Sequence, residues 1–200
     1  MRRFRTCALA VMCAAVALCA ENKKFATGTA SSYSTKQTND QVTIAAVPYD
    51  TEELAHTAFG KLNPNQYGVL PVLIIIQNDT DKAIRLDLQT EYIAMDGSRV
   101  EPTPMQDVRY VGQSAKRPQP NMGSPIPPGV FKKKNPLAGE EIPERAFLAR
   151  MLPPHESASG FLYFQTKHRP GSKLYVAGLA EAQSGKGFVY FEIGLDKPDK

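Results

Sequence analysis

Three histidines are the side chains of this 200-residue chain best suited to metal binding or general-base chemistry. His56, His155 and His168 stand far apart, without the short ligand spacings or the cysteine set of a zinc site. No Gly-x-Ser-x-Gly elbow supplies a serine nucleophile. We therefore expect no metal, no cofactor and no catalytic site. The alternative is a hydrolase of glycans or peptides in which His155 or His168 acts with a carboxylate such as Glu156.

A short acidic segment also has the residue types of a cation site. Residues 78–81, Asn-Asp-Thr-Asp, place oxygen ligands at alternate positions, as the start of a calcium loop does. Ala83 and Gln89 stand where the rest of that loop needs a glycine and a glutamate. Asparagine and aspartate are also common in tight turns, so we interpret the segment as a turn between strands.

Aromatic side chains give the clearest candidate for a binding surface. In the last forty residues they alternate along three predicted strands, so each set lies on one face of its strand. If those strands are neighbours, the rings form one continuous patch. The alternative is that the rings pair across strands beneath the helix or the proline-rich segment and belong to the core. We favour this alternative, because the core of a β-sandwich needs such large apolar side chains. The candidate binding patch is Phe161, Tyr163, Tyr175, Phe188 and Tyr190.

The charge balance gives no general reason to expect nucleic acid as a partner. The whole chain has a formal net charge of +4, from 24 basic and 20 acidic residues. Three of the basic residues are Arg2, Arg3 and Arg5, and the part of the chain after residue 20 is nearly neutral.

The first twenty residues have the three-part pattern of a secretory signal peptide: a basic start, an apolar run and small residues near the end. We expect cleavage near Cys19 or Ala20 and a periplasmic or secreted product. The alternative is a lipoprotein box over residues 16–19, with Cys19 lipidated, although Leu18 is unusual before a lipidated cysteine. A membrane contact is expected only through this signal or such a lipid, since the apolar run is shorter than the ~20 residues of a spanning helix.

The remaining chain is expected to form one β domain without disulfides, because all three cysteines (Cys7, Cys13 and Cys19) lie in the predicted signal. We predict a polar linker over 21–41, a single domain over 42–196 and a tail over 197–200. Within the domain, 102–154 is a proline-rich excursion, either laid along the sheet or mobile. Strands are predicted at 42–47, 69–77, 84–88, 91–95, 160–165, 173–177 and 187–195, and a helix at 51–59.

Strands separated by turns, rather than by helices, favour an antiparallel sheet. The predicted fold class is therefore mainly β: an immunoglobulin-like antiparallel β-sandwich with one short helix. The continuous apolar run at 72–76 suits a central strand that is covered on both faces.

Two segments resemble a known pattern. Residues 68–81 are an apolar strand that ends in Asn and a small polar turn, and 152–164 are a Leu-x-Pro turn that leads into a Gly-Phe-x-x-Phe-like strand. The pair resembles uncharacterised, exported bacterial proteins with immunoglobulin-like domains. The resemblance covers about 30 residues, with His155 in place of the usual glycine, and it implies a fold rather than an activity.

From these features we expect a non-enzymatic, exported module that binds another molecule or supports an assembly of the cell envelope. Its partner would be an unknown protein or glycan of the envelope. The hydrolase named above, acting on envelope glycans or peptides, is the alternative.

Overall fold

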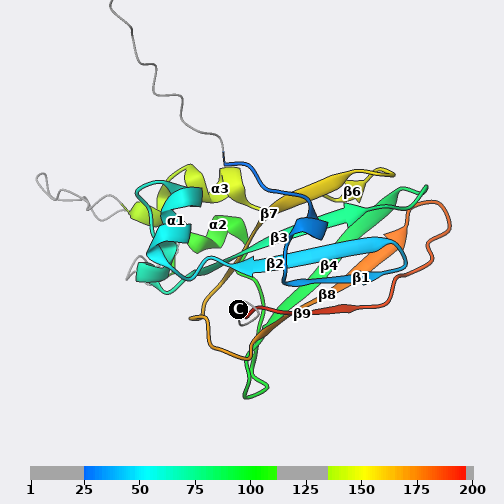
Figure 1. Cartoon of the computed structure of the whole chain (residues 1–200). Helices are drawn as coiled ribbons and strands as arrows, with labels where there is room; N and C mark the ends of the chain where they lie inside the picture. The colour runs from blue at the N-terminus through cyan, green and yellow to red at the C-terminus, as the bar shows by residue number, and fades with distance from the viewer. Residues whose placement is uncertain (1–24, 112–134, 197–200) are drawn as a thin grey trace, which may run out of the picture.

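A computed structural model describes residues 25–111 and 135–196, which form two antiparallel sheets and a group of short helices (Figure 1). The first sheet has the order β1 (Lys36–Asn39), β2 (Val42–Pro48), β3 (Leu70–Asn78) and β7 (Ser157–Phe164). The second sheet has the order β5 (Arg99–Val100), β4 (Ile84–Ile93), β8 (Lys173–Glu181) and β9 (Phe191–Gly194), and β6 (Met151–Leu152) also pairs with β4. The prediction of a mainly β chain is confirmed.

The central strand of the first sheet is β3, which pairs with β2 on one side and β7 on the other. One of its faces, with Ile74 and Ile76, packs in a core shared with the second sheet. Its other face, with Leu73 and Ile75, packs in a second core beneath the helices. Burial on both faces explains why the sequence shows a continuous apolar run here instead of alternation.

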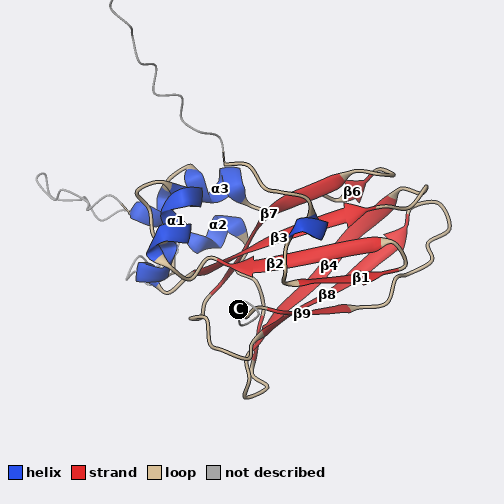
Figure 2. Ribbon diagram, viewed as in Figure 1, coloured by secondary structure: helices blue, strands red, loops and turns tan. Residues whose placement is uncertain are grey.

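The helices lie over the outer face of the first sheet, and all of them except η1 gather at the end where β2 finishes and β3 begins (Figure 2). They are η1 (Ala30–Ser32), α1 (Glu52–Phe59), η2 (Pro64–Tyr67), α2 (Met105–Val108), η3 (Pro136–Ala138) and α3 (Glu141–Arg145). The predicted helix α1 is confirmed. The Thr51 hydroxyl accepts a hydrogen bond from the Leu54 amide at 3.3 Å and caps the helix, and Gly60 ends it with a φ of 62°.

The connection between β3 and β4 does not join neighbouring strands of one sheet, because the two strands belong to different sheets. The buried side chain of Asn78 holds this connection. Its amide nitrogen donates to the carbonyl oxygens of Lys82 at 2.8 Å and Pro153 at 2.9 Å. The two strands expected at 84–88 and 91–95 form a single strand, β4. Its register against β8 shifts between Leu86 and Gln89.

Three further expectations need correction. Residues 36–39, expected within a polar linker, form β1. This edge strand has only one half-buried face and therefore no apolar pattern. The last strand is shorter than the predicted 187–195, because β9 covers only Phe191–Gly194. Val189, inside the predicted strand, is 62% exposed. The described parts of the proline-rich segment form short helices and β6 rather than one extended layer.

The rest of that segment, residues 112–134, lies outside the described residues, as do the predicted signal peptide with Cys19 and the tail. Within 25–111 and 135–196, no helix is both long and apolar enough to span a membrane.

Candidate functional site

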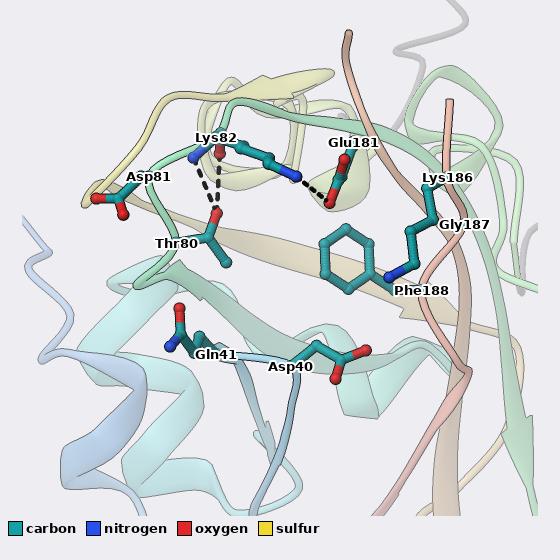
Figure 3. A pocket seen from close by; sticks show the side chains of 9 residues that line it. All are labelled: Asp40, Gln41, Thr80, Asp81, Lys82, Glu181, Lys186, Gly187 and Phe188. Atoms are coloured by element: carbon teal, nitrogen blue, oxygen red, sulfur yellow. Dashed lines mark hydrogen bonds and ion pairs between the residues drawn. The ribbon is translucent and has the colours of Figure 1, made fainter. Parts of the chain in front are cut away.

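Three connections meet at the end of the sheets opposite the helices and enclose a cleft of about 430 Å³ (Figure 3). They are the β1–β2 turn, the β3–β4 connection and the β8–β9 connection. We call this space the end cleft. Its lining residues are Asp40, Gln41, Thr80, Asp81, Lys82, Glu181, Lys186, Gly187 and Phe188.

The β1–β2 turn contributes Asp40 and Gln41, and both have left-handed backbones, with φ of 47° and 61°. Two successive residues with positive φ give the tight hairpin turn that matches the twist of the flanking strands. Glycine or asparagine would adopt this conformation at lower cost than glutamine. The turn therefore has a longer polar side chain at a position where the backbone conformation disfavours one. Both side chains are exposed at the cleft.

The β3–β4 connection is held from within by side-chain hydrogen bonds. The Thr80 hydroxyl donates to the Asn78 amide oxygen at 2.7 Å, and that oxygen also accepts from the Thr80 amide at 3.0 Å. Since Asn78 is fully buried, this turn has a fixed position relative to both sheets.

An ion pair joins the β3–β4 connection to the end of β8. The Lys82 ammonium lies 2.9 Å from a Glu181 carboxylate oxygen, and the Ser184 hydroxyl donates to the other oxygen at 2.6 Å. These two hydrogen bonds hold the pKa of Glu181 below its ordinary value, and the one from Ser184 has the larger effect. The carboxylate is therefore ionised at neutral pH.

Three polar side chains of the end cleft form no direct polar contact with the described residues. In the described part of the chain, the side chains of Asp40, Gln41 and Lys186 make no hydrogen bond or ion pair, and they border the same space (Figure 3). Between them lies the ring of Phe188, which is half-buried and packs against the core shared by the sheets. The cleft therefore offers an acceptor, a donor, an amide and an apolar ring to a ligand.

The aromatic residues expected to form one patch are separated. Phe161 and Tyr163 are each 2% exposed in the core beneath the helices, and the Tyr163 hydroxyl donates to the Ile142 carbonyl at 2.8 Å. The rings of Tyr175 and Tyr190 lie 5.5 Å apart on the second sheet. The patch is not continuous because β7 belongs to the first sheet, whereas β8 and the residues before β9 belong to the second.

The histidines are not gathered in one place. His155 pairs with Asp81 at 3.0 Å, rather than with Glu156, and its side chain is 64% exposed. His168 lies 3.6 Å from Asp196, and its Nδ1 atom is buried without a hydrogen-bond partner among the described residues. In residues 25–111 and 135–196, no three or more histidine, cysteine or acidic side chains are grouped closely enough to hold a metal ion.

The sequence interpretation missed most residues of the end cleft. Asp40, Gln41 and Lys186 lie in segments whose composition indicates turns, which is the only signal they give. Their convergence depends on which strands pair, and a local pattern does not contain that information. Phe188 belongs to the predicted aromatic patch, and Thr80 and Asp81 belong to the segment 78–81 that was interpreted as a turn rather than as a cation site. Comparison with protein-family models and with curated proteins finds no match to this chain.

Proposed function

We propose that this protein is a non-enzymatic, exported binding module of the bacterial cell envelope, with an immunoglobulin-like β-sandwich, and that the end cleft is its binding site. One observation supports this most strongly: both sheets contribute turns to a single cleft in which the side chains of Asp40, Gln41 and Lys186 make no hydrogen bond or ion pair with other described residues. Binding residues concentrate on loops that a rigid scaffold positions, and small-ligand sites are typically about 300–1,000 Å³ in volume.

The support beneath the cleft suits binding. The Asn78 amide and the Lys82–Glu181 pair fix two of the three connections before any ligand arrives. A site that is already ordered loses less conformational entropy on binding, which raises affinity for the same contacts.

The alternative, an envelope hydrolase, has one point in its favour: His155 and His168 each lie beside a carboxylate. Hydrolysis through a serine, threonine or cysteine nucleophile also needs that hydroxyl or thiol in hydrogen-bond contact with the histidine. Neither histidine has such a contact within the described residues. The geometry therefore favours binding over hydrolysis through such a nucleophile.

Co-sedimentation of the mature chain with purified peptidoglycan sacculi and with outer-membrane vesicles tests the proposal. We expect the chain to bind one of these preparations, and the double variant Asp40→Ala/Lys186→Ala to bind at least about tenfold more weakly. Both residues are exposed, so the fold should tolerate the change. The matched control is Lys61→Ala/Glu101→Ala, which removes the same charges from exposed positions that do not line the cleft.

Binding that survives in the cleft variant, or no binding to either preparation, would overturn the proposal. Release of soluble fragments from the sacculi, abolished by His155→Ala or His168→Ala, would establish the hydrolase instead.

A further inference from the structure

We infer that the end cleft binds a neutral oligosaccharide, with one sugar ring against Phe188 and the next units toward Tyr190. This inference rests on the proposed function and names the ligand class of the same site. It depends on three observations: an aromatic ring inside a polar cleft, a balanced set of free polar groups, and a second groove that shares Asp40 with the first.

The Phe188 ring provides the first observation. It lies in the middle of the end cleft (Figure 3), and its backbone amide donates to the Leu179 carbonyl at 2.9 Å. Because the side chain also packs against the shared core, the ring has a fixed position. An apolar ring surrounded by polar side chains matches a ligand that has an apolar face and polar edges. A pyranose has this form, with C–H groups on its faces and hydroxyl groups around its rim.

The polar groups provide the second observation. A carboxylate only accepts hydrogen bonds, an ammonium only donates them, and an amide does both. Asp40, Lys186 and Gln41 present one of each. A hydroxyl group both donates and accepts, so sugar hydroxyls can satisfy all three side chains.

The balance of charge argues against strongly charged ligands. The lining contains three acids and two lysines, and Lys82 is already paired with Glu181. An anionic ligand would approach Asp40 and Asp81, whereas a cationic ligand would approach Lys186. A neutral ligand has neither unfavourable interaction.

The third observation is a groove beside the end cleft. Its volume is about 410 Å³, and it is lined by Gln37, Asn39, Asp40, Val189 and Tyr190. The Asn39 side chain donates to the Tyr190 carbonyl at 3.3 Å, and the Gln37 side chain accepts from the Glu192 amide at 2.8 Å. These bonds tie the edges of the two sheets together along the groove.

Tyr190 gives this groove an exposed ring. Its side chain is 51% exposed, and it stacks at 5.5 Å against Tyr175. Since Asp40 lines both spaces, a ligand longer than one or two sugar units can contact Phe188 in the first and Tyr190 in the second.

Titration of the mature chain with defined, neutral oligosaccharides tests this inference. The probes are di- and tetrasaccharides of glucose and of N-acetylglucosamine, followed by isothermal titration calorimetry and by amide chemical shifts. We expect a tetrasaccharide of one series to bind and to shift the amides of Gln41 and Phe188. Asp40→Asn and Phe188→Leu should each weaken binding at least about tenfold.

Variants of Tyr190 distinguish its contact with the ligand from the contact that Phe188 makes. Tyr190→Ala should weaken tetrasaccharide binding about two- to tenfold, as expected for one lost aromatic contact, and leave disaccharide binding unchanged. Tyr190→Phe, which keeps the ring, should bind like the parent chain. Thermal unfolding of each variant shows whether it remains folded, and Tyr190, being exposed, keeps the test valid if Phe188→Leu does not fold.

Two outcomes would overturn the inference. The first is that no oligosaccharide binds, or that binding is unaffected by Asp40→Asn and Tyr190→Ala. The second is that a dipeptide such as D-alanyl-D-alanine shifts the cleft amides whereas the sugars do not, which would assign a zwitterionic ligand. If the chain binds sacculi or vesicles through the cleft but binds no oligosaccharide, the proposed function stands and only the saccharide assignment fails.

Discussion

A single buried amide links the two sheets. The Asn78 side chain donates to carbonyl oxygens of Lys82, Leu152 and Pro153, and it accepts from Thr80. It therefore satisfies polar groups on two connections at once. Because a buried polar group without a partner is costly, the fully buried Asn78 side chain requires both connections to stay in place around it.

Asn78→Ala should lower the free energy of unfolding by about 2–4 kcal/mol, since it removes every hydrogen bond that this fully buried side chain makes. Urea unfolding at neutral pH measures this change. Gln106→Ala, at an exposed position, should change stability by less than about 0.5 kcal/mol. Equal midpoints for Asn78→Ala and the parent would show that Asn78 does not hold the connection.

A buried phenol should make stability sensitive to alkaline pH. Burial, with a smaller contribution from Tyr33, raises the pKa of Tyr49 from 10.0 to about 12. The fold therefore favours the neutral phenol, and this contribution is fully present below pH 10. It is lost as the pH rises from 10 to 12, because the unfolded chain then releases a proton that the folded chain retains.

We expect the free energy of unfolding to fall by up to about 2 kcal/mol from this residue between pH 10 and pH 12. Urea unfolding at pH 9, 10, 11 and 12 measures it. Tyr49→Phe should show a smaller decrease over the same range. Part of the decrease should remain in that variant, since burial also raises the pKa of Tyr163. Parallel curves for the variant and the parent would contradict this prediction.

Among the elements, those with strong local signals were predictable and those defined by distant pairing were not. The apolar run of β3 and the capped helix α1 follow from their own residues. Edge strand β1 has no apolar face, so nothing in its sequence separates it from a linker. The sheet to which β4 or β7 belongs is set by partners far along the chain, which periodicity does not specify. For the same reason the end cleft could not be assembled from the sequence.

The central position of β3 predicts a large cost for truncating one of its side chains. Ile75 is 1% exposed and faces the core beneath the helices. Ile75→Ala should lower the free energy of unfolding by roughly 2–5 kcal/mol, through lost burial and the cavity left behind. Chemical denaturation gives the value, and Val189→Ala, at a position 62% exposed, is the near-neutral control. An unchanged midpoint for Ile75→Ala would contradict the assignment of β3 as a buried central strand.

For the whole molecule, the distribution of cysteine predicts how the chain is stabilised and released. All three cysteines lie within the first nineteen residues, so the packed cores must stabilise the domain. A reductant should therefore leave the unfolding midpoint of the mature chain unchanged.

The intact mass of the mature chain should correspond to a start near Ala20 or Glu21, without lipid, and the protein should be released without detergent. Recovery in the detergent phase, with Cys19→Ser returning it to the aqueous phase, would show a lipoprotein instead.

The pairing of both central strands determines when the chain can fold as it emerges from a ribosome or a translocation channel. Gln77 pairs with Ser157, and Ile93 pairs with Lys173, so in each case 80 positions separate the partners. The first half of the chain therefore cannot complete either sheet, and contacts of such long range form slowly. Lys186 and Phe188 arrive later still. An incomplete chain consequently has no end cleft, which forms only once the β8–β9 connection has been synthesised and has joined the other two connections.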